Sequence, residues 1–295
     1  MKIGVVVSDA GAAQHLSLLT KDNNERFLFH IVGTAKKIFE LNKNFAQSRS
    51  LDEIFANSSH IYIGRSWESG IGLDVIEQAK ISQIETTLFL DHWGFEAQEF
   101  TKDGKLLTPS NVIVFDEYAF GEATALFPGV PISIHKNLYL SGIKASIETL
   151  KLNKPKFPNS LLYLSEPIDR HLELKLKYAK PSDVSLNFSE MQAFDYMLSK
   201  LDLISTNIDS IVIRPHPADI LKDLEETFLG KDSRIRFSES QELISDIYES
   251  DYVAGSQTFG LAISVMTGKK TYSIIPPGGG NLVIPYDDII MLRDL

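Results

Sequence analysis

An arginine and a histidine directly follow one predicted strand: Ile213 ends an apolar run, and Arg214-Pro215-His216-Pro217 comes next. An arginine guanidinium is a planar fork of N–H donors that fits a phosphate or a carboxylate. The two prolines stiffen the backbone around His216, so we expect its imidazole to point in a fixed direction. The pattern predicts an anion-binding site at Arg214 and His216. The alternative is that Pro217 only opens a helix and Arg214 forms a surface ion pair.

A small, hydroxyl-rich turn follows the predicted strand at 251–254 in the same half of the chain. Its residues Gly255, Ser256, Gln257 and Thr258 lead into an apolar helix. Such a strand-to-helix turn exposes backbone N–H groups at the positive end of the helix, which is a favourable seat for a phosphate. The turn therefore predicts further contacts to an anionic ligand. Alternatively, one of the three polar residues is only a helix N-cap.

The first predicted strand of the chain ends in Ser8 and Asp9, with Gly11 two residues later. Gly11 and its alanine neighbours permit the close approach of a ligand, and Asp9 is the candidate general base. Asp9 is equally suited to be the N-cap of the helix that follows, and His15 lies on that helix. A dinucleotide fingerprint G-x-G-x-x-G and a P-loop are both missing from the sequence.

Two polar patches follow two further strands of the same half: Asp91-His92 after one, and Asp116-Glu117 after the other. We expect them to contact a second substrate or to orient the residues that do. The alternatives are that they are buried polar residues with satisfied hydrogen bonds, or that Asp91 and His92 begin a metal site. No third ligand has a recognisable metal-binding spacing, so the sequence predicts no metal.

These residues are positioned by short apolar runs that alternate with amphipathic stretches along the whole chain, a pattern typical of parallel sheets with crossover helices. A polar stretch with two prolines at 152–159 is the best linker. The sequence therefore predicts an α/β protein with two Rossmann-like domains, at 1–152 and 160–295, that face each other across a cleft. The predicted strands are 3–8, 27–32, 60–64, 86–91, 111–115, 131–135, 160–165, 210–214, 234–237, 251–254 and 271–275. The predicted helices are 11–20, 34–41, 70–80, 117–126, 141–150, 188–202, 219–228, 240–249 and 258–268.

Composition narrows the classes of function. The 295 residues include 43% hydrophobic and 23% charged residues, no cysteine, and a net charge of −10. This balance is typical of a globular protein with a sizeable core, and the missing cysteines suit a cytoplasmic location. The charge and the lack of a basic cluster argue against nucleic acid as a partner. No apolar run is long enough to cross a membrane, so we expect at most peripheral contact with its inner face.

The Arg-Pro-His-Pro motif, followed by a Ser/Thr-bearing turn into a helix, resembles bacterial GT-B-type glycosyltransferases of surface-polysaccharide synthesis. The closest resemblance is to the sialyltransferase and polysialyltransferase-like group, and the CDP-glycerol transferases and nucleotide-sugar epimerases share the plan. The resemblance implies that Arg214, His216, Ser256 and Thr258 meet the phosphate of a nucleotide donor. It also implies that Asp9 holds the position of a base, where the family's acidic-acidic-glycine motif reads Asp-Ala-Gly.

The resulting hypothesis is a metal-independent glycosyltransferase without a cofactor, since the metal-binding Asp-x-Asp motif does not occur in the sequence. It moves a sugar from a nucleotide-sugar donor, CMP-linked or another pyrimidine nucleotide, to a glycan or lipid-linked acceptor. Asp9 and His216 are the expected catalytic residues. Two alternatives stay open: a nucleotide-sugar epimerase or hydrolase on the same fold, and a non-catalytic protein that binds a nucleotide or glycan as a scaffold.

Overall fold

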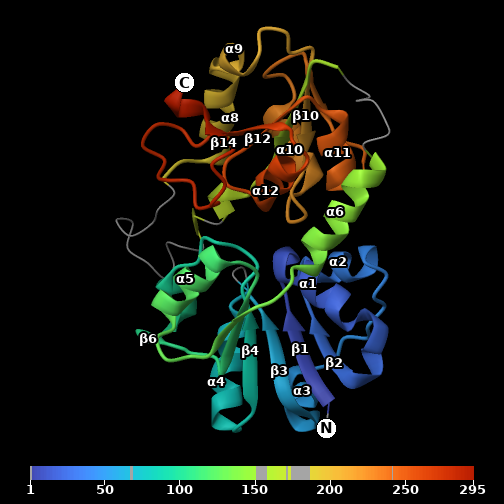
Figure 1. Cartoon of the computed structure of the whole chain (residues 1–295), viewed down its shortest axis with the longest axis vertical. Helices are drawn as coiled ribbons and strands as arrows, with labels where there is room; N and C mark the ends of the chain where they lie inside the picture. The colour runs from blue at the N-terminus through green and yellow to red at the C-terminus, as the bar shows by residue number, and fades with distance from the viewer. Residues whose placement is uncertain (1, 67–68, 151–157, 171, 174–186, 241) are drawn as a thin grey trace. The chain divides into compact units, whose positions relative to one another are not determined.

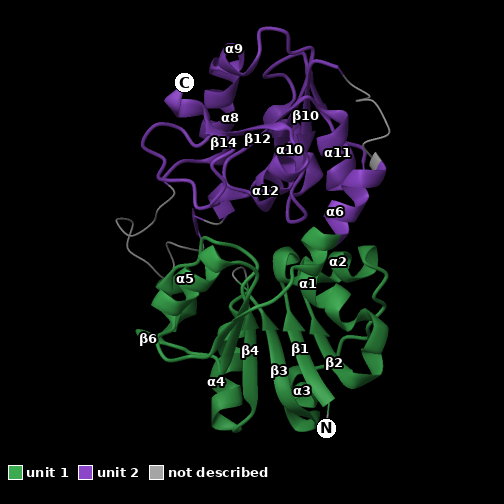
Figure 2. Ribbon diagram, viewed as in Figure 1, with its two compact units in different colours: residues 1–141 green, residues 142–295 purple. Residues whose placement is uncertain are grey.

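The computed structural model describes residues 2–66, 69–150, 158–170, 172–173, 187–240 and 242–295. The chain forms two compact units, residues 1–141 and 142–295 (Figure 2), each built on its own six-stranded sheet. The division between them lies in helix α6 (Leu138–Leu150), ahead of the predicted linker. Residues 151–157 of that linker lie outside the described residues.

The sheet of the first unit is parallel throughout, in the order β2-β1-β3-β4-β7-β8, and Figure 1 shows its first four strands side by side. The strands are β1 (Lys2–Val7), β2 (Phe27–Ile31), β3 (Ser58–Gly64), β4 (Glu85–Phe89), β7 (Asn111–Val114) and β8 (Ile132–Ile134). The helices include α1 (Ala10–Thr20), η1 (Lys21–Arg26), α2 (Ala35–Leu41), α3 (Leu51–Asn57), α4 (Ile71–Ile81), η2 (Ala97–Phe100) and α5 (Glu117–Leu126). A short antiparallel hairpin, β5 (Thr101–Lys102) and β6 (Lys105–Leu106), follows η2.

The sheet of the second unit is also parallel, in the order β11-β10-β9-β12-β13-β14. This is the strand order of the Rossmann fold. The strands are β9 (Ser160–Leu164), β10 (Ser210–Arg214), β11 (Ile235–Phe237), β12 (Tyr252–Gly255), β13 (Lys270–Ser273) and β14 (Ile289–Met291). The helices include α8 (Glu190–Ser199), α9 (Leu201–Ile204), α10 (Leu221–Phe228), α11 (Leu243–Glu249), α12 (Phe259–Met266) and η4 (Leu292–Asp294).

The central strands are apolar because helices cover both of their sides. In β1, four consecutive residues from Gly4 to Val7 are buried, and all five residues of β9 are buried. Continuous apolar runs of this kind are typical of parallel strands that have no solvent-facing side. The sequence prediction of two α/β halves with Rossmann-like sheets is confirmed.

In the described part of the chain, the features that were not predicted from the sequence include helix α3, the β5–β6 hairpin, the strand β14 and the 3-10 helices η1, η2 and η4. Helix α3 begins at a capping box, in which the Ser50 hydroxyl accepts from the Glu53 N–H and the Glu53 carboxylate accepts from the Ser50 N–H. This pairing satisfies two backbone donors that a helix start otherwise leaves unpaired.

The predicted helix at 188–202 is interrupted at Lys200, between α8 and α9. Of the helices in the described ranges, none is both long and apolar enough to span a membrane.

Two glycines of the first unit provide a matched test of packing at the ends of the strands. A Cβ on Gly64 would lie 2.8 Å from the Ala12 Cβ and 2.8 Å from Val7 Cγ2, whereas a Cβ on Gly121, within α5, would meet nothing within 4 Å. We expect Gly64→Ala to lower the free energy of unfolding by about 1–3 kcal/mol through overpacking. Gly121→Ala should raise it by up to about 1 kcal/mol, because alanine has the higher helix propensity. Urea unfolding measures the stability of both variants. Equal effects of the two substitutions would contradict the close packing of Gly64 against Ala12 and Val7.

Candidate functional site

The strand order reverses once in each sheet, between β1 and β3 in the first unit and between β9 and β12 in the second. Neighbouring loops leave such a point in opposite directions, so a crevice opens at the carboxyl ends of those strands, and ligands bind there in open α/β sheets. Asp9 follows β1 and Arg65 follows β3, while Glu166 follows β9 and Gln257 follows β12. Each unit therefore has its own group of candidate site residues at the reversal of its strand order.

Asp9 occupies the N-cap position of α1 with extended backbone angles, but its side chain caps no N–H of the helix. Its Oδ1 instead accepts a hydrogen bond from the Ser8 hydroxyl at 2.6 Å. The Ser8 hydroxyl in turn accepts one from the Ser69 hydroxyl at 3.0 Å. The carboxylate is thus oriented by hydroxyl groups at the positive end of the helix.

Asp91 lies directly over Gly11 on the first turn of α1. A Cβ built on Gly11 would be 1.7 Å from Asp91 Oδ2, so only glycine leaves room for this carboxylate. Burial raises the pKa of Asp91 to about 6, Arg65 opposes that rise, and the negative charge of Asp9 adds to it. Asp91 therefore shares this end of the sheet with the carboxyl group of Asp9 and the guanidinium of Arg65.

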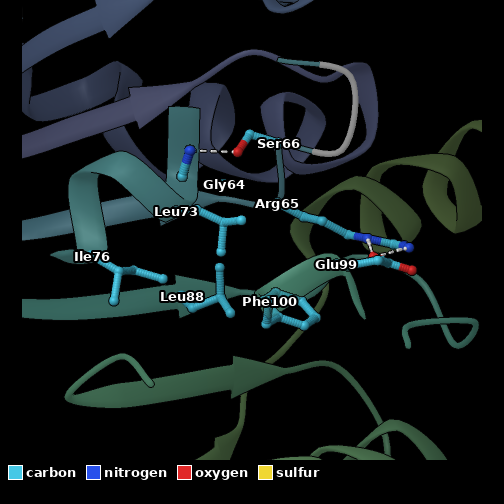
Figure 3. A pocket seen from close by; sticks show the side chains of 9 residues that line it. Gly64, Arg65, Ser66, Leu73, Ile76, Leu88, Glu99 and Phe100 are labelled. Atoms are coloured by element: carbon cyan, nitrogen blue, oxygen red, sulfur yellow. Dashed lines mark hydrogen bonds and ion pairs between the residues drawn. The ribbon is translucent and has the colours of Figure 1, made fainter. Parts of the chain in front are cut away.

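Arg65 is the cation of this group and was not singled out from the sequence. Its Nε donates to Glu99 Oε2 at 2.8 Å (Figure 3). Its Nη2 donates to the Gly94 carbonyl at 2.9 Å. Burial alone would lower the pKa of Arg65, but the carboxylates of Glu99, Asp91 and Asp9 raise it above its usual value. Arg65 therefore stays charged and fixes the loop that follows β4.

The cavity beside the Arg65–Glu99 pair is too small for a sugar. It has a volume of about 20 Å³, and apolar side chains of Ile76, Leu88 and Phe100 line one part of it (Figure 3). A void of this size holds about one water molecule. A sugar or a nucleotide therefore does not fit within this cavity.

The two polar patches predicted after β4 and β7 are tied to each other. Trp93 Nε1 donates to Asp116 Oδ2 at 2.6 Å, and Asp116 Oδ1 accepts the Ala119 N–H at 2.8 Å as the N-cap of α5. Both oxygens of Asp116 thus accept hydrogen bonds from the protein, and Glu117 is exposed in the first turn of α5. His92 Nδ1 accepts the Gly94 N–H at 3.0 Å, which leaves the proton of a neutral ring on Nε2.

His15 is buried between aromatic rings, with centroids 4.4 Å from Phe115 and 5.7 Å from Phe89. Burial lowers its pKa to about 4, with a smaller contribution from His135. Among the described residues, its Nδ1 has no hydrogen-bond partner. His15 is therefore a neutral ring within the apolar side of α1.

In the second unit, Arg214 at the end of β10 forms an ion pair with the buried Asp246 of α11 and also donates to the Ser240 carbonyl at 3.2 Å. Asp246 accepts from the Ser238 hydroxyl as well, at 2.7 Å. The alternative interpretation of an ion pair thus describes part of what Arg214 does. The ion pair fixes the guanidinium of Arg214 at the end of β10. The hydrogen bonds to Ser238 and Ser240 hold the loop after β11.

His216 is held in one orientation by the turn that follows it. Its backbone N–H donates to Asp219 Oδ2 at 2.7 Å, and the backbone N–H of Asp219 donates to the His216 carbonyl at 2.9 Å. The Ala218 N–H donates to the ring Nδ1 at 3.2 Å. Burial lowers the pKa of His216, Asp219 raises it and Arg170 lowers it further. The ring is therefore neutral at pH 7, with its remaining proton on Nε2 as a hydrogen-bond donor.

The turn before α12 presents polar atoms at the point where the strand order reverses. The Gln257 N–H donates to Glu166 Oε2 at 3.0 Å, and Thr258 is the N-cap, accepting from the Gly260 N–H at 3.4 Å. Within the described part of the chain, the buried Ser256 Oγ and Gln257 Oε1 have no hydrogen-bond partner. A Cβ on Gly260 would lie 2.6 Å from Leu164 Cδ1, so glycine lets the helix start pack against the end of β9.

A buried carboxylate beneath this turn was also missed in the sequence. Glu190 Oε1, at the start of α8, accepts hydrogen bonds from the Tyr163 hydroxyl at 2.9 Å and from the Glu166 N–H at 3.0 Å. The Ser165 hydroxyl lies 2.7 Å from the same oxygen. Burial raises the pKa of Glu190 to about 7, and Asp219 adds to that rise.

The structure thus brings Asp9, Gly11 and Asp91 together in the first unit. In the second unit it places Arg214 and His216 after β10 and the 256–258 turn after β12, with β9 between these two strands. Arg65, Ser165 and Glu166 also directly follow strands, so the rule that located His216 could have found them. Across the described residues, no three His, Asp or Glu side chains are grouped as metal ligands.

No known protein family matches this sequence, and no curated protein does. Similar solved structures include the UDP-GlcNAc 2-epimerase from Neisseria meningitidis bound to UDP-GlcNAc, with a TM-score of 0.56 and 11% identity over 88% of this chain and 79% of that one. The UDP-GlcNAc 2-epimerase from Methanocaldococcus jannaschii has a TM-score of 0.51 and 10% identity, over 92% and 83%. A glycosyltransferase from Rickettsia africae has a TM-score of 0.50 and 11% identity, over 92% and 78%.

At such low identity these likenesses show the fold alone. The chain has the fold of GT-B-type glycosyltransferases and UDP-GlcNAc 2-epimerases, built on two Rossmann-like domains.

Proposed function

We propose that this protein is a metal-independent glycosyltransferase of surface-polysaccharide synthesis. It transfers a sugar from a nucleotide-sugar donor, CMP-linked or another pyrimidine nucleotide, to a glycan or lipid-linked acceptor. The second unit binds the donor and the first unit provides the base. The proposal rests on the fold and on the chemistry of the two groups of strand-end residues.

The observation that carries the proposal is the turn before α12. It presents the N–H of Gln257 at the positive end of a helix, next to unpartnered atoms of Ser256 and Gln257. A carboxylate of the protein, that of Glu166, already accepts the Gln257 N–H. An oxyanion is therefore the kind of group that this turn stabilises, and a phosphate oxygen is an equivalent acceptor.

His216 and Arg214 supply the remaining positive and donor groups for the phosphate. The neutral imidazole donates through Nε2–H, since the Ala218 N–H already occupies Nδ1. Arg214 is paired with Asp246 at the end of β10. Its positive charge attracts the phosphate, and any guanidinium N–H that points toward the ligand donates to a phosphate oxygen. Preorganised donors that meet the charge developing on a leaving group are worth about 3 kcal/mol each in the barrier.

In the transfer step, the acceptor hydroxyl loses its proton to the Asp9 carboxylate while its oxygen bonds to the anomeric carbon. The bond from that carbon to the phosphate oxygen breaks, and the electron pair leaves with the nucleotide. Asp9 suits this role because hydroxyl groups orient its carboxylate and the helix cap does not use it. Asp91, with a pKa of about 6, is a second carboxyl group, after Asp9, that could take up the proton of the acceptor hydroxyl.

The second candidate function is a nucleotide-sugar epimerase, which the likeness to two UDP-GlcNAc 2-epimerases favours. Both candidate functions need the same donor site. They differ in that an epimerase turns over its nucleotide sugar without an acceptor.

Nucleotide binding is the first test. In a thermal-shift screen of CMP, CDP, UDP and GDP compounds, we expect a pyrimidine nucleotide to raise the melting temperature. A ligand at 100 times its Kd adds about 2.7 kcal/mol to stability. Incubating the binding nucleotide sugar with and without a glycan acceptor then separates transfer from epimerisation. A flat response to every nucleotide would contradict the donor site.

His216→Ala removes the proposed phosphate donor. We expect nucleotide affinity to fall about 10- to 100-fold, the loss of one hydrogen bond to a charged group. The melting temperature of the free protein should barely change, because the Asp219 carboxylate still accepts the residue-216 N–H. Calorimetric titration measures the affinity, with His135→Ala, at an exposed histidine, as the matched control. A large loss of stability with unchanged affinity would make His216 a structural residue.

Asp9→Asn tests the base. Asparagine keeps the shape of the side chain, and its Oδ1 accepts from the Ser8 hydroxyl as the Asp9 carboxylate does, so stability and nucleotide affinity should stay near wild type. Transfer should fall at least about 10²-fold, the usual contribution of a general base. Asp52→Asn, at an exposed aspartate in the first turn of α3, is the control for loss of a carboxylate. Transfer at the wild-type rate in Asp9→Asn would move the role to Asp91.

A further inference from the structure

Ser165 lies between two carboxyl groups. Its Oγ is 2.7 Å from Glu190 Oε1 and 2.7 Å from Asp219 Oδ2. A serine hydroxyl carries one proton and can donate it to only one of the two oxygens. If both carboxyl groups were ionised, the second contact would be lone pair against lone pair. Two such short contacts therefore require one more proton, carried by Glu190 or Asp219.

The surroundings of Glu190 favour placing this proton on the Glu190 carboxyl group. The side chain is buried, and burial with the charge of Asp219 raises its pKa to about 7. Among the described residues, other ionisable groups that lie near it are Tyr163 of β9, Glu166 after that strand, and Asp169, whose Oδ2 accepts the Glu190 backbone N–H at 3.1 Å. Burial and the charge of Glu190 raise the pKa of Tyr163, so this phenol keeps its own proton.

The bridge leads directly to the His216 turn. The Asp219 oxygen that contacts Ser165 also accepts the His216 N–H at 2.7 Å. On the other side, the Glu190 oxygen that contacts Ser165 accepts the N–H of Glu166, whose carboxylate holds the Gln257 N–H. One hydrogen-bonded chain thus connects α8 to both turns of the proposed donor site.

We propose that Glu190 and Asp219 share a proton through the Ser165 hydroxyl, and that this proton holds the His216 turn in the conformation that binds the donor phosphate. The second part of the proposal rests on the proposed function. Loss of the proton leaves Glu190 and Asp219 both negatively charged on either side of the Ser165 hydroxyl. The two carboxylates repel each other, so the Asp219 side chain moves away and the His216 turn becomes less rigid. Burial lowers the pKa of His216 below its usual value, so the His216 ring is mostly neutral above about pH 7, where the proton of the pair is lost.

The shared proton is tested without any ligand. Carbon-13 carboxyl resonances of glutamate-labelled protein, with Glu190 assigned by its loss in Glu190→Gln, should show a titration midpoint near pH 7. Asp219→Asn should lower that midpoint by about half a pH unit or more, because it removes the like charge and the need for a second proton. A midpoint at the ordinary glutamate value, or one that Asp219→Asn leaves unchanged, would overturn the shared proton.

The link to donor binding is tested by the pH dependence of affinity. UDP-N-acetylglucosamine and CMP-N-acetylneuraminate are suitable probes, because their phosphate diesters neither gain nor lose a proton near neutral pH. Wild-type affinity should fall above about pH 7, by at most about tenfold per pH unit for a single proton. Ser165→Ala and Asp219→Asn should weaken binding at about pH 6 and remove this pH dependence.

Tyr163→Phe is the matched control, since it also removes one hydroxyl that contacts Glu190 Oε1 but does not touch the bridge to Asp219. It should keep the pH dependence of the wild type. If Tyr163→Phe and Ser165→Ala behave alike, or if wild-type affinity does not change with pH, the link is overturned. A protein that binds neither probe at any pH contradicts the donor site and the link, while the carboxyl titration still decides the shared proton.

Discussion

The reversal of strand order in each parallel sheet is the constraint on which the rest of this structure depends. At the reversal, the loops after β1 and β3, and those after β9 and β12, leave the sheet in opposite directions, so helix N-termini and polar side chains lie at the ends of these strands. Asp9, Arg65, Glu166 and Gln257 occupy these four loop positions. Polar side chains gather there because the apolar strands behind them have no surface at which such groups can be hydrated.

The same constraint explains why the charged residues of both units come in hydrogen-bonded groups. A half-buried arginine needs a partner, and Arg65 has Glu99 as Arg214 has Asp246. Each pair fixes a loop after a strand: the one after β4 in the first unit, and the one after β11 in the second. Removing one member would leave its partner as an uncompensated charge, so these pairs stabilise the positions of the loops.

The fold was predictable because both of its signals are local in the sequence. Buried strands such as β1 and β9 appear as continuous apolar runs, and strand ends place Asp9, His216 and Gln257 without knowledge of contacts. What could not be predicted depends on contacts between distant segments. Glu190 follows a long polar stretch, and nothing near it in the sequence shows that it meets Ser165 and Asp219. Helix α3 is different, because Ser50 and Glu53 form a capping box that the sequence already contains.

The proposed donor site combines fixed positive groups with carboxyl groups whose charge can change. The backbone N–H groups before α12 carry no ionisable proton in this range, and the guanidinium of Arg214 is held by its ion pair with Asp246. Besides Asp246, which is paired with Arg214, the acidic side chains Glu166, Glu190 and Asp219 contribute up to three negative charges, which oppose an anionic ligand. A proton held between Glu190 and Asp219 removes one of these charges without disturbing the hydrogen bonds that orient His216. Glu166 differs from that pair, because its carboxylate accepts the N–H that a phosphate would use, so a bound phosphate must displace it or share that donor. The balance of charge at this strand end is therefore set by carboxyl groups more than by the cations that first draw attention in the sequence.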